Sequence, residues 1–257
     1  MIRTYKVESL TQFIEKVCHV RAKWCREDGL YFDPWFRGIR DSAWGLEPSL
    51  YRLKLADDES FIRSEYRRRA AQLMTEREPP SEWGWYFLMQ HYGAPTRLLD
   101  WTDGALIAVF FALLPGKIGD PDVTSEAAVW MLDPWWLNKE ALSFDNILSV
   151  DGREASPYLE AFDESLHEEF PVAIDPPHIA RRLGVQHSRF TVHGKLLNGL
   201  EKVGARNGSR LIKIVILQSA VHEMRTDLGT CGIVDTTVFP DLEGLSRELI
   251  RARTELW

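Results

Sequence analysis

The first periodic pattern of the chain lies between Ser9 and Cys25. Its apolar residues recur at spacings of four, three and four positions, and they are Phe13, Val17, Val20 and Trp24. This spacing places them on one face of a helix. The pattern therefore predicts that residues 1–30 contain an amphipathic N-terminal helix with one face toward the core.

Three segments are typical of strands. The aromatic stretch 31–38 comes first, with Arg37 near its end and Gly38 suited to a turn where a Cβ would clash. Residues 127–132 and 211–217 follow as apolar runs of strand length. We therefore expect a sheet that joins distant parts of the chain.

Two helices are predicted between the first two strands. Residues 57–78 are highly charged and indicate a surface helix, which Pro79-Pro80 ends because proline offers no amide hydrogen. Ser81 can cap the second helix. That helix ends at Gly93, a residue suited to the left-handed position after a helix.

Residues 105–114 are the most hydrophobic stretch of the chain, and their length indicates a buried helix. Thr102 or Asp103 can cap this helix, after an extended segment at 95–100. Residues 239–253 predict an amphipathic helix near the end of the chain.

Together these elements predict an α+β fold, a single mixed domain over residues 1–257 with a central, partly antiparallel sheet flanked by helices. Residues 31–133 form its core and 176–257 its C-terminal part. Between them, residues 142–175 are acidic and weakly periodic. They are either a lid that folds over a site or an ordinary surface insertion.

The charge balance argues against nucleic acid as a partner. The chain has 31 Lys and Arg against 38 Asp and Glu, a net charge of −7, so no overall positive field attracts a polyanion. The arginine-rich segment 63–77 is diluted by glutamates, which favours a solvated helix face.

Cysteine usage and hydropathy indicate a cytoplasmic protein. Cys18, Cys25 and Cys231 form no CxxC pair, so we expect free thiols and no metal site. No apolar run approaches the roughly 20 residues of a membrane helix, and we expect no membrane association. The motifs GxxxxGK[ST], GxGxxG, HExxH and GxSxG are also missing, which argues against ATPases, simple dehydrogenases, zinc proteases and α/β-hydrolases.

Two places carry candidate chemistry. Arg37 follows two aromatic residues, so its guanidinium can hold a phosphate, a carboxylate or a ribose, or it can form an internal ion pair with Asp100 or Asp103. The second place is rich in polar side chains: Gln90, His91, Thr96, Arg97, Asp100 and Thr102. These form a ligand site, or Asp100 and Thr102 cap the next helix while Arg97 pairs with Asp100.

The same segments resemble the FRG domain. Trp35-Phe36-Arg37-Gly38 and the block Trp44–Arg52 are similar to its opening signature, and Gln90–Thr102 running into residues 105–112 resembles its most distinctive block. Further similar blocks are His178–Gln186 with Phe190–Gly194, and Gly232-Ile233 with Val238–Leu242. The resemblance implies a protein of bacteria or phages, and we expect Gly38, Arg52 and the polar side chains of the second block to bind a ligand.

A more distant likeness is to ADP-ribosyltransferases, which use NAD as a substrate. It implies that Arg37 holds the nicotinamide-side ribose, that Thr102 frames it, and that Gln186 stands where those enzymes have a catalytic carboxylate. A glutamine cannot act as a base. The chain is therefore either an NAD-consuming effector of phage defence or of a toxin system, or a non-catalytic module that recognises a ligand, a nucleotide or a partner protein.

Overall fold

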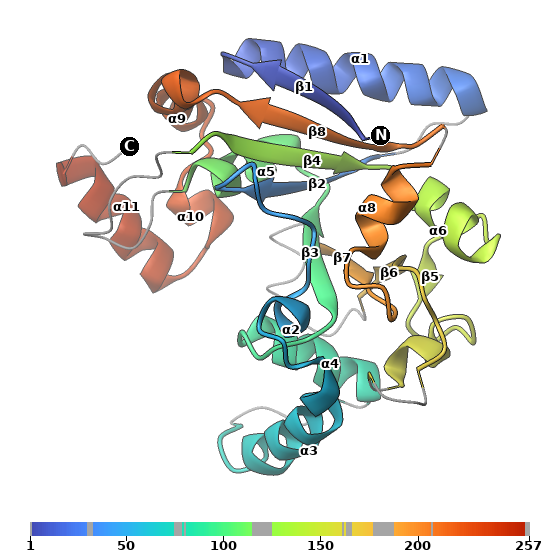
Figure 1. Ribbon diagram of the computed structural model, residues 1–257. Helices are drawn as coiled ribbons and strands as arrows, with labels where there is room; N and C mark the ends of the chain where they lie inside the picture. Colours follow the sequence, from blue (N-terminus) through green and yellow to red (C-terminus); the bar gives the residue numbers. More distant parts are fainter. Residues whose placement is uncertain are drawn as a thin grey trace.

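Strands from distant parts of the chain form a single mixed sheet, in an α+β arrangement (Figure 1). The computed structural model describes residues 2–29, 33–74, 79, 81–114, 125–160, 162, 166–176, 188–206 and 208–254. Within these residues, eight strands lie in the order β1-β8-β4-β2-β3-β7-β6-β5. They are β1 (Arg3–Val7), β2 (Trp35–Ile39), β3 (Leu98–Thr102), β4 (Ala127–Leu132), β5 (Leu148–Ser149), β6 (Val172–Asp175), β7 (Ser188–Val192) and β8 (Leu211–Ile216).

The sheet is joined weakly at its centre. The outer pairs β1–β8 and β5–β6 are parallel, and the pairs between them are antiparallel. Five residue pairs link β2 to β4, but β2 and β3 share only the pair Phe36 and Thr102. In Figure 1, β1, β8, β4 and β2 accordingly run across the view while β3 runs down it. The sheet therefore consists of two halves that diverge at the junction of β2 and β3.

Helices cover both halves. They are α1 (Leu10–Asp28), α2 (Ser49–Arg52), α3 (Glu59–Ala70), α4 (Glu82–His91), α5 (Ala105–Leu113), α6 (Pro134–Leu142), α8 (Gly199–Gly204), α9 (Val221–Thr230), α10 (Asp235–Val238) and α11 (Leu242–Thr254), with short 3-10 helices η1 (Ala56–Asp58), η2 (Ser156–Leu159) and η3 (Gln218–Ala220). One core cluster joins α1, α5 and α9 to one face of the half formed by β1, β8, β4 and β2. Helices α6 and α8 pack on the other face of this half. A third cluster joins α4 to β3, β7 and β6.

Local signals in the sequence predicted many of these elements. Helix α1 begins after Ser9, whose hydroxyl accepts a hydrogen bond from the amide of Gln12 at 3.2 Å. Helix α4 is capped in the same way by Ser81, and Gly93 follows it at φ 76°. The predicted strands at 127–132 and 211–217 and the buried helix at 105–114 are confirmed as β4, β8 and α5.

Three local predictions were wrong. Gly38 makes no turn, because it lies inside β2. The N-cap of α5 is Gly104 rather than Thr102 or Asp103, and the Thr102 hydroxyl accepts a hydrogen bond from the Gly104 amide at 3.1 Å instead. Helix α3 ends at Ala70, and Ala71, Gln72 and Leu73 form a turn directly after it.

The segment 142–175 contributes to the sheet. Its β5 and β6 pair with each other, β6 pairs with β7, and the side chains of Leu148, Tyr158 and Ile174 are buried in the third core cluster. None of its described residues lines the pocket discussed below. The described part of this segment therefore belongs to the half of the sheet that begins with β3, and it does not line the pocket.

Candidate functional site

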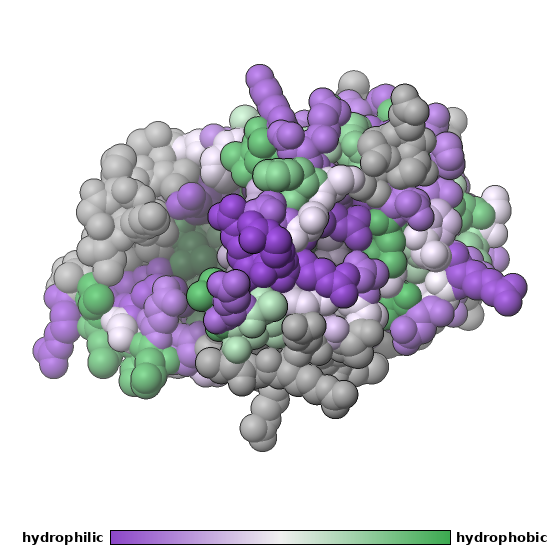
Figure 2. All heavy atoms as spheres, turned by 90° about the horizontal axis from the view of Figure 1, so that it is seen from below, coloured by the Kyte–Doolittle hydropathy of each residue, from purple (hydrophilic) through white to green (hydrophobic). Residues whose placement is uncertain are grey.

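A large pocket opens where the two halves of the sheet diverge. Its volume is about 1040 Å³, at the upper end of the range for ligand sites. Strand β2 and the loop after it line one side and β3 another, and α5, α11 and Phe239 complete the wall. Seen from below, this side of the molecule is hollowed, and hydrophilic side chains gather beside the hollow (Figure 2).

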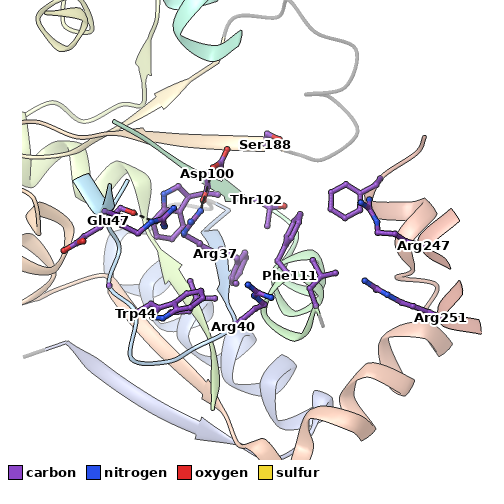
Figure 3. Close-up of a pocket in the computed structure, with 18 residues that line it drawn as sticks. Arg37, Arg40, Trp44, Glu47, Asp100, Thr102, Phe111, Ser188, Arg247 and Arg251 are labelled. Atoms are coloured by element: carbon purple, nitrogen blue, oxygen red, sulfur yellow. Dashed lines mark hydrogen bonds and ion pairs between the residues drawn. The ribbon is translucent and has the colours of Figure 1, made fainter. Parts of the chain in front are cut away.

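Positive charge dominates the pocket. Five arginines of the described chain line it, and they are Arg37, Arg40, Arg52, Arg247 and Arg251. Figure 3 labels all of them except Arg52. Two carboxylates, Glu47 and Asp100, oppose them. The chain as a whole carries a net charge of −7, so this excess is local. A concave site with arginines converging from several elements suits an anionic ligand.

Arg37 and Asp100 meet at the junction of β2 and β3. Arg37 Nη1 donates to the backbone oxygen of Asp100 at 2.6 Å and lies 4.0 Å from its Oδ2. Burial lowers the pKa of Arg37, and Asp100 partly offsets this effect. The pocket walls desolvate Asp100 and raise its pKa, although 54% of its side chain is exposed to the cavity. The predicted internal pair between Arg37 and Asp100 therefore exists, and it faces the pocket.

Gln90 fixes the Asp100 carboxylate of this pair. Its side-chain amide nitrogen donates to Asp100 Oδ2 at 2.6 Å, and its oxygen accepts a hydrogen bond from the buried Thr96 hydroxyl at 2.5 Å. Each amide end thus has one partner, which fixes the orientation of the Gln90 side chain. Thr96 and Gln90 position Asp100 without lining the pocket themselves.

The opposite wall comes from the C-terminal helix. Arg247 and Arg251 lie one turn apart on α11, and Figure 3 shows both projecting from α11 toward the cavity. The buried carboxylate of Asp235 lies 3.4 Å from Arg247 and 2.8 Å from Arg251. The Arg247 guanidinium also stacks over the ring of Phe239, 4.4 Å from its centroid. These contacts place two positive charges across the pocket from Arg37.

Aromatic rings supply the apolar surface of the pocket. Trp44 is 51% exposed, with the Arg40 guanidinium 6.0 Å from its ring centroid. Phe111 of α5 meets Phe239 edge to face, with centroids 5.8 Å apart. Aromatic rings that line a pocket beside guanidinium groups suit a planar ring that carries anionic groups.

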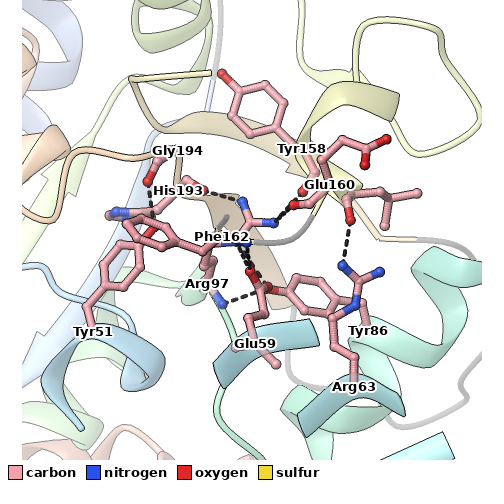
Figure 4. A network of polar contacts seen from close by, with 12 residues as sticks. Tyr51, Glu59, Arg63, Tyr86, Arg97, Tyr158, Glu160, Phe162, His193 and Gly194 are labelled. Carbon is pink, nitrogen blue, oxygen red and sulfur yellow. Dashed lines mark hydrogen bonds and ion pairs between the residues drawn. The ribbon is translucent and has the colours of Figure 1, made fainter. Parts of the chain in front are cut away.

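Arg97 lies outside this pocket in a buried network (Figure 4). Its side chain is 0% exposed and its Nε lies 3.0 and 2.9 Å from the two oxygens of Glu59. Nη1 donates to the backbone oxygen of His193, and Nη2 donates to those of Tyr158 and Glu160, at 2.6 to 2.7 Å. The pairing of Arg97 with Asp100 that the sequence suggested was wrong, because Glu59 takes that place.

His193 borders the same network without a polar partner for its ring. It is fully buried, and within the described residues neither ring nitrogen makes a hydrogen bond. Burial, together with the nearby charges of Arg97 and Arg37, lowers its pKa to about 3. The imidazole is therefore neutral in the folded protein at neutral pH.

We expect this histidine to make the protein less stable in mild acid. The unfolded chain takes up the proton near pH 6.5 and the folded chain only near pH 3. The stabilisation is thus complete above pH 6.5 and is lost as the pH falls, by up to about 1.4 kcal/mol per pH unit. Urea unfolding at about pH 7 and about pH 5 checks this. His193→Leu should lose less stability between these pH values than the wild type, and an equal loss would contradict the assignment.

The structure brings some of the predicted site residues together. Arg37, Gly38, Arg52, Asp100 and Thr102 line the pocket. Gln90 and Thr96 support it, Arg97 is in the buried network, and the exposed His91 lies outside both. Gln186 lies outside the described residues. Sequence reasoning missed Arg40, Trp44, Arg247 and Arg251, although the i, i+4 spacing of the last two was a signal that they share a helix face.

Two searches of the described residues gave no site of another kind. No three histidine, cysteine, aspartate or glutamate side chains of this part of the chain are grouped so as to hold a metal ion. Among the described helices, none has the length and apolar character needed to cross a membrane.

The comparison with known families gives one result. Residues 33–117 match the FRG domain. This FRG domain match runs from just before β2 to just after α5, and so includes Arg37, Arg40 and Asp100 but not the arginines of α11. The similar blocks further along the chain lie outside the match, so their assignment to the same family stays a prediction. The comparisons with curated proteins and with solved structures each gave no significant match.

Proposed function

We propose that the pocket binds a nucleotide of the NAD class. The observation that carries this proposal is the group of five arginines beside the exposed ring of Trp44 and the half-buried rings of Phe111 and Phe239 in a cavity of about 1040 Å³. Guanidinium groups hold phosphates through paired hydrogen bonds, and aromatic faces stack on a base. A nucleotide presents both chemistries, and the volume is large enough for a dinucleotide.

The arrangement of the junction supports an NAD-consuming activity similar to that of ADP-ribosyltransferases. Arg37 on β2 and Thr102 on β3 share the pocket, and the alanine-rich helix α5 follows directly. Arg37 would hold the ribose next to nicotinamide, and the carboxylate of Asp100 lies beside it. A negative group in that place would stabilise positive charge that develops on the ribose as the bond to nicotinamide breaks. A role in phage defence or in a toxin system rests on the family resemblance alone.

A second proposal is a recognition module that binds the same ligand without turnover. The interactions of the Asp100 carboxylate favour this second proposal, because the carboxylate already accepts a hydrogen bond from Gln90 and lies near Arg37. A carboxylate held in this way is less available for chemistry. Nicotinamide release separates the two proposals, because only the enzyme produces it.

Arg37→Ala is expected to weaken NAD binding by roughly 10- to 100-fold, which corresponds to the loss of a hydrogen bond to a charged group. Calorimetric titration with NAD measures the affinity, and nicotinamide is followed in the same samples. Arg206→Ala is the matched control, because Arg206 has a similar ion pair with Glu140 and does not line the pocket. No binding by folded wild-type protein would rule out the NAD proposal, and binding without nicotinamide release would favour the recognition module.

A further inference from the structure

Trp44 presents an exposed indole ring to the pocket. It lies in the loop between β2 and α2, lines the cavity and is 51% exposed (Figure 3). Among the tryptophans that the structure describes, it is the only one with an exposed side chain. Leaving so large an apolar surface in water forgoes the stabilisation that burial gives. A ligand that covers the ring inside the pocket accounts for its position.

The loop that carries Trp44 is fixed on both sides of this residue. Before it, the backbone oxygen of Asp41 accepts a hydrogen bond from the Trp44 amide at 3.1 Å. After it, the side chain of Leu46 is fully buried, and its amide donates to Glu201 Oε1 of α8 at 2.6 Å. The backbone at Trp44 is therefore ordered before any ligand arrives, which reduces the entropy lost on binding.

Arg40 adds a positive charge beside the indole. Its guanidinium lies over the Trp44 ring, 6.0 Å from the centroid, and the half-buried side chain also lines the pocket. No carboxylate of the described chain pairs with it. A flat apolar ring and an unbalanced cation thus lie next to each other. Together they match a ligand in which a planar ring and an anionic group are close in the same molecule, as in a mononucleotide.

We infer that Trp44 stacks on the adenine ring of the bound nucleotide, and that Arg40 contacts the phosphate next to that adenosine. The two fused rings of adenine match the indole in size and shape, and aromatic side chains are common stacking surfaces for bases. Because the guanidinium and the indole are neighbours, the base and the phosphate of one mononucleotide can meet both.

This inference rests on the proposed function and specifies it further, because it assigns the adenine end of the ligand. The proposed function places the nicotinamide-side ribose at Arg37, at the junction of β2 and β3. Arg40 follows three residues later, about 10 Å further along an extended chain. The loop after β2 therefore lies away from the reacting end of the ligand, where the adenosine half belongs.

The test is calorimetric titration of the full chain with AMP and with nicotinamide mononucleotide, the two halves of NAD. Trp44→Ala should weaken AMP binding by at least roughly tenfold, the effect of losing one stacked base, and leave nicotinamide mononucleotide binding as in the wild type. Trp44→Phe should lose less, because a smaller aromatic face remains. Tyr92→Ala is the control, since this side chain is 71% exposed and lies outside the pocket. It should bind AMP as the wild type does.

Arg40→Gln provides a second variant that tests the phosphate contact. It should weaken binding of AMP and leave binding of adenosine unchanged, because adenosine has no phosphate. If Trp44→Ala does not fold, Trp44→Phe and Arg40→Gln decide the question.

The outcomes separate this inference from the proposed function. Equal AMP binding by the wild type and the Trp44 variants overturns the inference, and so does a loss of nicotinamide mononucleotide binding in Trp44→Ala, which would place nicotinamide on this ring. AMP binding that depends on Trp44, without binding of NAD, supports the inference and rejects the proposed function. NAD binding that depends on Arg37 but not on Trp44 does the reverse.

Discussion

Glu59→Gln is expected to lower the free energy of unfolding by about 3–5 kcal/mol, because it leaves the positive charge of Arg97 buried without an opposite charge beside it. Both side chains are at most 1% exposed, and the two carboxylate oxygens lie 2.9 and 3.0 Å from Arg97 Nε. The same carboxylate accepts hydrogen bonds from the Tyr86 hydroxyl and the Phe162 amide, each at 2.6 Å. Its loss therefore affects α3, α4, β3 and the segment after η2 together. Urea unfolding at neutral pH measures the effect.

Glu82→Gln is the matched control for this prediction. Glu82 pairs with Arg67 at 2.5 Å, but both side chains are more than half exposed, at 53% and 54%. Water and salt screen such a pair, and its loss should cost less than about 1 kcal/mol. A similar decrease in the free energy of unfolding for the two variants would mean that burial does not determine how much Glu59 contributes to stability.

The elements that could be predicted are those specified by neighbouring residues. Ser9 and Ser81 cap the amides three residues further on, so a short stretch of sequence shows where α1 and α4 begin. The apolar character of α5 likewise needs no tertiary information. In contrast, the partner of Arg97 is 38 residues away along the chain, and the nearer Asp100 was the obvious candidate. Local reasoning fails where the fold brings a distant carboxylate into a desolvated position.

The residues of the candidate site also fall into those that local sequence patterns predicted and those that depend on the tertiary structure. Arg37, Asp100 and Thr102 belong to motifs that are dense in polar side chains between apolar positions, and the structure places all three in the pocket. Arg247 and Arg251 were missed because α11 looks like an ordinary amphipathic helix near the end of the chain. Only the position of α11 beside the junction of β2 and β3 gives them a role. Such a role depends on topology, which the periodicity of one helix does not contain.

The segment 142–175 shows a further limit. Its acidic residues and weak periodicity suggested an excursion, since short strands of two and four residues give little pattern. These strands are stabilised by pairing within the sheet and by the burial of Leu148, Val172 and Ile174 in the third core cluster. The sequence shows the composition of such strands but not their partners.

Gly38→Ala is expected to lower the free energy of unfolding by about 3 kcal/mol or more, which is the upper range for overpacking in a core. A Cβ at this position would lie 2.0 Å from the backbone oxygen of Ala108 and 2.6 Å from the backbone nitrogen of Ala112. Both atoms belong to the backbone of α5, so no side-chain rotation can relieve the contact. The reason for glycine here is space, since its φ lies outside the left-handed range. Helix α5 would have to move away from β2, and Phe111, which lines the pocket from α5, would move with it.

Gly229→Ala separates this steric effect from the general effect of adding a methyl group. Gly229 lies in α9 with no atom within 4 Å of the added Cβ. Alanine is the better helix former by about 1 kcal/mol, so this variant should be as stable as the wild type or slightly more stable. Thermal and urea unfolding of the two variants give the comparison. If the free energy of unfolding of Gly38→Ala stays within about 1 kcal/mol of the wild-type value, then α5 can move away from β2 without loss of stability. The distance between them would then not be what sets the shape of the pocket.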